Sequence, residues 1–287
     1  MPRSPSPLRY PGGKACLYKR IAAILRANKL ERRRYVEPFA GGGGLALSLL
    51  YGGHVSDIHI NDLDRAIWAF WHSALDHTDA LVAKIEKTPI TIEEWHSQRD
   101  VYRRADTSAP VDLGFAAFFL NRTNRSGIIG SGGLIGGFAQ NGRYKLDCRF
   151  NRAELTRRVR RIAVYRDRIH LTGQDAREFI AASRGQLPEA TFFFVDPPYF
   201  AKGASLYRNA YRSKDHENLS GDLLALENPW IVTYDAVPEI AALYRGRRQF
   251  PIDINYSAQR KRVGTELMIV SKGLKVPAQS TAREGAA

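Results

Sequence analysis

A strand, a glycine loop and a helix follow one another in the stretch Tyr35-Val-Glu-Pro-Phe-Ala-Gly-Gly-Gly-Gly-Leu-Ala-Leu-Ser-Leu-Leu50. Glycines directly after a strand let a ligand approach the backbone closely. No Lys-Ser/Thr pair follows these glycines, so the loop is not a P-loop, and the G-x-G-x-x-G spacing of a dinucleotide site is absent. The stretch therefore predicts the first turn of an open α/β sheet that binds a different ligand.

The alternation of strands and helices extends over most of the 287 residues and predicts an α/β protein with parallel strand pairing. Residues 190–195 are apolar apart from Thr191, as in a central strand that is buried on both faces. The expected strands are residues 35–36, 54–60, 168–172, 190–195, 230–234, 249–256 and 265–270. Helices are expected at residues 16–29, 45–51, 65–75, 152–165 and 175–183.

A long stretch without strand signals interrupts this alternation at residues 68–150. Helices are expected within it at residues 79–87, 92–105 and 112–121. Six glycines between Arg125 and Phe138 forbid a stable helix and favour a hairpin or a flexible loop. We therefore predict one domain made of residues 1–67 and 151–275, a mainly helical insert with a hairpin at residues 68–150, and a disordered tail at residues 276–287.

The composition excludes several classes of protein. The longest apolar runs are far shorter than the ~20 residues of a membrane-spanning helix, and the N-terminus lacks the apolar segment of a secretion signal. Two cysteines cannot build a disulfide framework or a cysteine-based zinc site, so we expect a cytoplasmic protein without a metal. A net charge of +14, concentrated in residues 3–34, 143–168 and 245–262, favours a nucleic acid as partner.

The glycine loop and an acid after the second strand fit a site for S-adenosylmethionine. Phe39-x-Gly41-x-Gly43 has the spacing of such a loop. Asp62 follows Gly43 by nineteen residues and is placed to bind the diol of a ribose. A tight structural turn with a capping Asp62 is the alternative interpretation.

A second polar motif, Asp196-Pro-Pro-Tyr199, directly follows the most buried strand, and ligands of open α/β sheets bind at that edge. Two successive prolines remove two N–H donors and fix φ, so the carbonyls of Asp196 and Pro197 can point outward unpaired. A carboxylate beside a carbonyl can accept both N–H groups of an exocyclic amine, and Tyr199 can stack on the planar base. The alternative is a simple strand-ending turn.

Together these motifs resemble those of the Dam-like DNA adenine-N6 methyltransferases, and the resemblance extends over residues 9–270. The first motif has Tyr10 where Trp is frequent in the family, and either ring can stack. Five segments carry the resemblance: Arg9-Tyr-Pro-Gly-Gly-Lys14, Glu37-Pro-Phe-Ala-Gly-Gly-Gly43, Ile60-Asn-Asp62, Gly173-Gln-Asp175-Ala176 and Asp196-Pro-Pro-Tyr199. Phe118-Phe-Leu-Asn-Arg122 is similar to the segment that leads into the DNA-reading hairpin of the family.

The resemblance implies a Rossmann-like sheet that uses S-adenosylmethionine to methylate N6 of an adenine flipped out of double-stranded DNA. It implies Asp196, Pro197 and Tyr199 as catalytic residues. The implied cofactor-binding residues are Tyr10, Gly12, Lys14, Glu37, Phe39, Gly41, Gly43, Asp62, Asp175, Ala176 and Asp196. Candidate DNA contacts in the insert are Arg122, Asn124, Arg125, Arg143 and Lys145. Arginines at 152–161, Arg158 among them, are expected to contact phosphates or to form a solvated helix face.

Other substrates remain open at this point: adenine in RNA, the N4 amine of cytosine, a glutamine side chain, or none in an inactive DNA-binding relative. Asp196 favours adenine, since N4-cytosine enzymes more often have Ser there and glutamine-methylating enzymes have Asn. Family members that read GATC carry aromatic and Asn-rich residues where this chain has residues 121–133, so that recognition sequence is not implied. The resemblance implies a monomer on DNA and leaves a partner restriction endonuclease open.

Overall fold

Seven strands form one mixed sheet in the computed structural model, which describes residues 4–10, 12–200, 211–256 and 262–278. The order across the sheet is β3-β2-β1-β4-β5-β7-β6. Neighbouring strands are parallel from β3 to β5, whereas β7 is antiparallel to both β5 and β6. The strands are β1 (Arg33–Glu37), β2 (Val55–Asn61), β3 (Ile169–Thr172), β4 (Phe192–Val195), β5 (Trp230–Asp235), β6 (Arg248–Tyr256) and β7 (Arg262–Val270).

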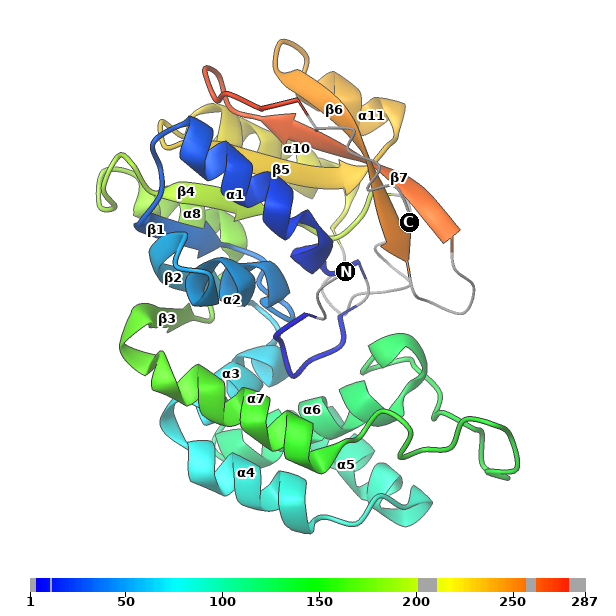
Figure 1. Ribbon diagram of the computed structural model, residues 1–287. Helices are drawn as coiled ribbons and strands as arrows, with labels where there is room; N and C mark the ends of the chain where they lie inside the picture. The colour runs from blue at the N-terminus through cyan, green and yellow to red at the C-terminus, as the bar shows by residue number, and fades with distance from the viewer. Residues whose placement is uncertain (1–3, 11, 201–210, 257–261, 279–287) are drawn as a thin grey trace, which may run out of the picture.

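Helices cover both faces of this sheet (Figure 1). One face packs against α1 (Tyr18–Ala27) and α2 (Gly44–Tyr51), and the other against α8 (Ala176–Ser183), α10 (Ser213–Leu224) and α11 (Pro238–Leu243). Successive side chains of β4 alternate between the two cores, with Phe192 and Phe194 in one and Phe193 and Val195 in the other. This burial on both faces explains why β4 is continuously apolar.

Five further helices lie together on the side of β3 (Figure 1). They are α3 (Arg65–Asp76), α4 (Thr78–Lys87), α5 (Ile92–Arg104), α6 (Pro110–Thr123) and α7 (Arg152–Val164). Gly114 lets α6 approach α3 closely, because a Cβ there would lie 2.5 Å from the carbonyl oxygen of Ala69. The apolar core of these helices is continuous with that of the sheet. The division of the chain at residues 68 and 150 stays a prediction.

The glycine-rich stretch folds back on itself without regular strands. An isolated antiparallel bridge between Asn124 and Leu134 closes the stretch around a short 3-10 turn, η2 (Arg125–Gly127). The N–H of Arg125 donates to the carbonyl of Gly133 at 2.9 Å, and the N–H of Ile135 donates to the carbonyl of Thr123 at 2.8 Å. The hairpin expected from the sequence is thus reduced to a single closing pair of residues.

Every strand and helix expected from the sequence is present, and the ends differ from the expected ones by at most three residues. The largest difference is at β7, which begins at residue 262 rather than at the expected residue 265. Two more 3-10 turns, η1 (Lys14–Leu17) and η3 (Arg166–Arg168), complete the elements of the residues that the structure describes. Sequence patterns do not predict α10, which contains a glycine, or α11, which has only six residues. None of the described helices is long and apolar enough to cross a membrane. Most of the tail predicted to be disordered lies outside the described residues.

Candidate active site

A cavity of about 910 Å³ lies at the carboxyl ends of the parallel strands. Its volume is within the range of small-molecule sites. Most of its wall comes from three parts of the chain: residues 4–10 and 12–15, the loops that follow the first four strands, and residues 126–131 of the glycine-rich stretch. Further lining residues include Tyr102, Arg122, Arg149, Arg158, Tyr211 and Ile254. Every residue that the resemblance implies for the cofactor lines this cavity, namely Tyr10, Gly12, Lys14, Glu37, Phe39, Gly41, Gly43, Asp62, Asp175, Ala176 and Asp196.

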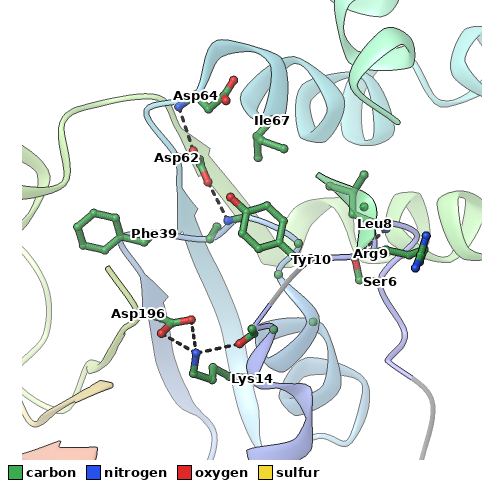
Figure 2. A pocket seen from close by; sticks show the side chains of 18 of the residues that line it. Ser6, Leu8, Arg9, Tyr10, Lys14, Phe39, Asp62, Asp64, Ile67 and Asp196 are labelled. Atoms are coloured by element: carbon green, nitrogen blue, oxygen red, sulfur yellow. Dashed lines mark hydrogen bonds and ion pairs between the residues drawn. The ribbon is translucent and has the colours of Figure 1, made fainter. Parts of the chain in front are cut away.

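The glycine loop after β1 is covered by the ring of Tyr10 (Figure 2). A Cβ at Gly41 would lie 2.7 Å from ring carbons of Tyr10, and the φ of Gly41 is +46°. Both facts restrict this position to glycine. From the other side, Nε1 of Trp71 donates to the carbonyl of Gly41 at 3.0 Å. The loop therefore presents bare backbone in a fixed conformation beside an aromatic ring.

Asp62 follows β2 and holds the glycine loop. Its Oδ2 accepts from the N–H of Gly41 at 2.7 Å, and its Oδ1 accepts from the N–H of Asp64 at 2.9 Å (Figure 2). Burial, reinforced by the charge of Asp64, raises the pKa of Asp62 to about 7. The carboxylate thus caps a turn and also lines the cavity, where its remaining lone pairs can accept from hydroxyl groups.

Glu37 ends β1 and fastens the first turn of α2. Its Oε1 accepts from the hydroxyl of Tyr35 at 2.8 Å and from the N–H of Ala46 at 3.1 Å. Burial raises the pKa of Glu37 to about 8, although the bond from Tyr35 opposes this. Its carboxyl group is therefore largely protonated at neutral pH.

Asp196 directly follows β4, and Nζ of Lys14 lies 2.8 Å from its carboxylate (Figure 2). The hydroxyl of Thr233 in β5 donates to Oδ1 of Asp196 at 2.8 Å. Nζ of Lys14 also donates to the carbonyl of Gly12 at 2.8 Å. Lys14 thus bonds within the N-terminal loop and to the acid of the second motif. The side chain of Asp196 stays 24% exposed and reaches the cavity.

The pKa values of this pair reflect burial and three charges. Burial raises the pKa of Asp196, Lys14 opposes the rise, and the nearby carboxylate of Glu266 adds to it. Burial acts to lower the pKa of Lys14, but the charges of Asp196 and Glu266 outweigh burial and raise it. Lys14 is therefore a cation throughout the physiological range.

Tyr199 packs inward rather than into the cavity. Its side chain is 5% exposed, and its hydroxyl donates to Oε1 of Glu266 in β7 at 2.7 Å. A Cβ at Gly12 would lie 2.5 Å from this hydroxyl oxygen. The cavity is lined by Asp196 and Pro198 of this motif, and Pro197 is buried beside them. Stacking of Tyr199 on a base stays a prediction.

The segment after β3 contributes the beginning of α8 to the cavity wall. Oδ1 of Asp175 caps this helix by accepting from the N–H groups of Arg177 at 2.9 Å and Glu178 at 3.3 Å. Ala176 is buried next to it. The loop after β3 is therefore held in one conformation by its own helix cap.

The candidate DNA contacts divide by exposure. Arg125, Arg143 and Lys145 are exposed around the glycine-rich stretch. Asn124 is buried, and its Oδ1 accepts from Nε1 of Trp95 at 2.7 Å. Its Nδ2 donates to the carbonyls of residues 128 and 129. Asn124 thus shapes the loop, and its contact with DNA stays a prediction.

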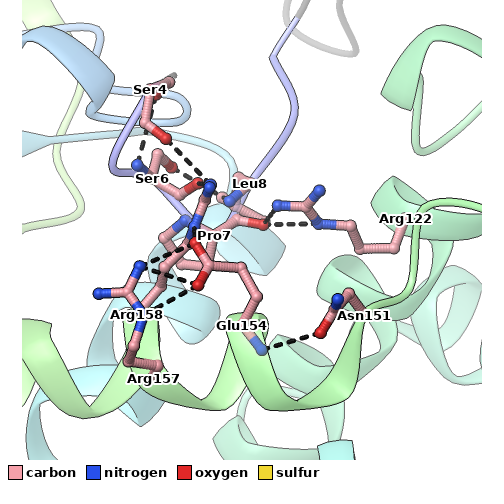
Figure 3. Close-up of polar contacts among 9 residues, drawn as sticks. All are labelled: Ser4, Ser6, Pro7, Leu8, Arg122, Asn151, Glu154, Arg157 and Arg158. Carbon is pink, nitrogen blue, oxygen red and sulfur yellow. Dashed lines mark hydrogen bonds and ion pairs between the residues drawn. The ribbon is translucent and has the colours of Figure 1, made fainter. Parts of the chain in front are cut away.

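Arg122 and Arg158 fasten the N-terminal segment to helices α6 and α7 (Figure 3). The guanidinium of Arg122 is buried and donates to the carbonyl of Pro7, at 2.7 Å from Nε. Nη1 of Arg158 donates to the carbonyls of Ser4 at 2.9 Å and Ser6 at 2.8 Å. Burial, followed by the charge of Arg158, lowers the pKa of Arg122 to about 9. Two of the guanidinium nitrogens of Arg122 thus bond inside the protein, although the residue also lines the cavity. Contact of Arg122 with DNA stays a prediction.

Sequence reasoning did not find three polar residues of this site: Asn121, Thr233 and Glu266. All three are fully buried and bond to residues that it did find. A signal for Glu266 existed, since this acid lies within the predicted strand 265–270, directly before the apolar run Leu-Met-Ile-Val270. A charge there predicts a buried partner, but the sequence does not say which one.

The sheet order with its antiparallel β6/β7 pair is typical of S-adenosylmethionine-dependent methyltransferases. Residues 10–256 match the profile of the D12 class N6 adenine-specific DNA methyltransferases, and the chain belongs to this family. It is therefore an enzyme that uses S-adenosylmethionine to methylate N6 of adenine in DNA.

Two solved structures that are similar to this one have low sequence identity to the chain. A Pyrococcus horikoshii structure described as a "putative RNA methyltransferase" is 9% identical, with a TM-score of 0.44 over 94% of this chain and 88% of the other. A SAM-dependent methyltransferase from Agrobacterium tumefaciens is 10% identical, with a TM-score of 0.35 over 87% of this chain and 61% of the other. The search of curated proteins found no match.

Proposed function

We propose that the enzyme acts on an adenine flipped out of double-stranded DNA, within a sequence read by residues 68–150. One observation supports this most directly: Asp196, the glycine loop and residues 126–131 line the same cavity. A base that enters beside the glycine-rich stretch can meet the cofactor at the carboxylate of Asp196. A base inside a duplex cannot reach such an enclosed group without leaving the stack.

The volume of the cavity and the chemistry of its wall suit S-adenosylmethionine. Bare backbone at residues 41–44, an aromatic ring above it and carboxylates after β2 and β3 match a nucleoside with a diol and an amine. When bound, the cofactor supplies an electrophilic methyl group. The residues that we assign to hold it are Tyr10, Gly12, Phe39, Gly41, Gly43, Asp62, Asp175 and Ala176. Glu37 and Lys14 hold other wall residues in place, since Glu37 bonds to the first turn of α2 and Lys14 bonds to Gly12 and Asp196.

Asp196 orients the amine of the adenine. A carboxylate has about four lone-pair sites. Thr233 and Lys14 occupy those of Oδ1, and Lys14 also bonds to Oδ2, which leaves a site on Oδ2 for an N–H group of the amine. The carbonyl of Pro197 is the proposed second acceptor. Two such bonds pull the nitrogen towards tetrahedral geometry and free its lone pair, and the fixed negative charge stabilises the cation that forms.

The proposed DNA surface is the exposed part of the glycine-rich stretch. We assign base or phosphate contacts first to Arg125, Arg143 and Lys145, because polar groups of Arg122 and Asn124 already bond inside the protein. Tyr144 adds an exposed ring whose face lies 5.6 Å from the guanidinium of Arg143. A monomer on DNA, a cytoplasmic location and a partner restriction endonuclease stay predictions.

Transfer of tritiated methyl groups to unmethylated duplex DNA, single-stranded DNA and RNA tests this proposal. We expect label in duplex DNA alone, as N6-methyladenine after digestion to nucleosides. Asp196→Ala should lose transfer and keep duplex binding in a gel-shift assay. Label in RNA or in N4-methylcytosine would overturn the substrate, and turnover by Asp196→Ala would overturn the role of the carboxylate.

A further inference from the structure

Glu266 is a fully buried acid in the middle of β7. Its register partners are Asp235 in β5 and Ile252 in β6, so it lies inside the sheet. A buried carboxylate is costly unless charged and hydrogen-bonded partners surround it. The proposed mechanism does not use Glu266, so its presence there calls for an explanation.

The partners of Glu266 are themselves parts of the site. Its Oε1 accepts from the hydroxyl of Tyr199 at 2.7 Å, and its Oε2 lies 3.4 Å from Nζ of Lys14. The same Nζ lies 2.8 Å from the carboxylate of Asp196 and 3.4 Å from the hydroxyl of Tyr199. One lysine is therefore shared by two carboxylates, and one of them is the proposed acceptor of the amine.

This sharing has an electrostatic consequence. A lysine paired with Asp196 alone would form a neutral pair and would cancel the charge that stabilises a cationic nitrogen. With Glu266 added, the formal charges of two acids and one lysine sum to −1. That excess charge acts strongly on a nearby nascent cation, because the site is largely screened from water.

We propose that Glu266 is a positioning residue for methyl transfer, which fixes Lys14 and Tyr199 and leaves a net negative charge behind the carboxylate of Asp196. The inference rests on the proposed role of Asp196 as acceptor. Other titratable or charged groups also face this group of residues. They are Cys16 beside Lys14, Glu37 from β1 and Asp235 from β5.

The test is the pH profile of single-turnover methyl transfer, measured with tritiated S-adenosylmethionine and saturating unmethylated duplex plasmid. For Glu266→Gln we expect a rate about tenfold lower, less than the hundredfold or more that follows loss of a direct transition-state contact. The dissociation constant of S-adenosylmethionine in calorimetry should change by less than about threefold, since Glu266 does not line the cavity. The acid limb of the profile should move to lower pH, because Asp196 loses a like charge.

Two further variants separate charge from structure. Glu266→Asp keeps the charge and should recover much of the rate, with the acid limb at its wild-type position. Asp253→Asn removes an exposed acid from neighbouring β6 and should leave both rate and profile unchanged. A wild-type rate in Glu266→Gln would overturn the inference. A lower rate with an unmoved acid limb would also overturn it, because that result means a purely structural role.

The experiments also show whether the Glu266→Gln variant fails to fold and whether the proposed role of Asp196 is wrong. If Glu266→Gln lacks a cooperative melting transition, Tyr199→Phe replaces it, since this variant removes the hydroxyl that Glu266 holds without removing a charge. Because Tyr199→Phe keeps all three charges, it tests only the positioning part of the inference. The rate should fall while the acid limb of the pH profile stays at its wild-type position, and an unchanged rate would refute the inference. Turnover by Asp196→Ala would refute the proposed function itself. An inactive Asp196→Ala beside a fully active Glu266→Gln would refute only the role of Glu266.

Discussion

The side-chain amide of Asn121 pairs with both backbone groups of Arg9. Its Oδ1 accepts from the N–H of Arg9 at 2.7 Å, and its Nδ2 donates to the carbonyl of Arg9 at 2.6 Å. The same Nδ2 donates to the carbonyl of Gly127 at 2.8 Å. A single buried residue at the end of α6 thus joins the glycine-rich stretch to the segment that carries Tyr10 and Lys14.

Replacement of Asn121 by Leu should disturb both stability and cofactor binding. The change keeps the size of the side chain but leaves three backbone groups without this partner. The bond to Gly127 is buried and the two bonds to Arg9 are partly buried, and a buried unsatisfied group costs about 1–3 kcal/mol. We expect a loss of at least about 2 kcal/mol in urea unfolding, and weaker S-adenosylmethionine binding because Tyr10 loses its anchor. Asn141→Leu, at an exposed position of the same region, is the control and should change neither. Equal behaviour of the two variants would contradict the anchoring role.

Arg157 and Arg158 form a natural pair of variants on α7. Both pair with Glu154, but only Arg158 donates to the carbonyls of Ser4 and Ser6 (Figure 3). Arg158→Ala should lower the free energy of unfolding by about 1–3 kcal/mol and raise the KM for S-adenosylmethionine. Arg157→Ala should change stability by less than about 1 kcal/mol, as is usual for exposed ion pairs. Similar losses in the two variants would show that the contact with the N-terminal segment contributes nothing.

The sequence predicts the framework better than the polar contacts behind it. All strands of the described residues, the glycine loop and every helix except α10 and α11 follow from local patterns. The contacts of Arg122 and Arg158 depend on which surface packs against the N-terminal segment. The sequence cannot distinguish an arginine that donates to a phosphate from one that donates to a backbone carbonyl. Glu266 and Lys14 are separated by most of the chain, so only the fold brings them to 3.4 Å.

Asp62 should couple cofactor binding to pH near neutrality. Its pKa is raised to about 7, so a large fraction of the carboxyl groups are protonated at neutral pH in the free protein. A ribose diol donates to the ionised form, so binding should lower this pKa and release a proton. Calorimetry at pH 7 in buffers of different ionisation enthalpy should detect the release and should show tighter binding as the pH rises from 6 to 8. Asp62→Ala should bind S-adenosylmethionine more weakly and without proton release, and an unchanged affinity would remove Asp62 from the site.

Glu37 should make the protein less stable as the pH rises. Its pKa is about 8 in the folded protein against 4.5 in the unfolded chain, so the folded state holds the proton more tightly. Its contribution is fully present below pH 4.5 and falls as the pH rises towards 8, by on the order of 4 kcal/mol. Glu37→Gln keeps an oxygen to accept from Tyr35 and Ala46 but does not titrate. In urea unfolding from pH 5 to 8, the variant should gain stability relative to the wild type, and parallel curves would refute this.

Arg125 should decide which sequences are methylated. Its exposed guanidinium stands where the glycine-rich stretch closes on itself, and its N–H donates to the carbonyl of Gly133, so its backbone is fixed while its side chain is free to read a base edge. A bidentate contact with guanine discriminates against other bases by about 1–3 kcal/mol. Long-read sequencing of DNA methylated by Arg125→Ala should therefore show relaxed preference at one position of the recognition site. Arg157→Ala removes an exposed arginine of α7 and should leave the preference intact, with at most a uniform loss of binding and a smaller salt dependence. If the two variants methylate the same sites in the same proportions, Arg125 contacts phosphates rather than bases.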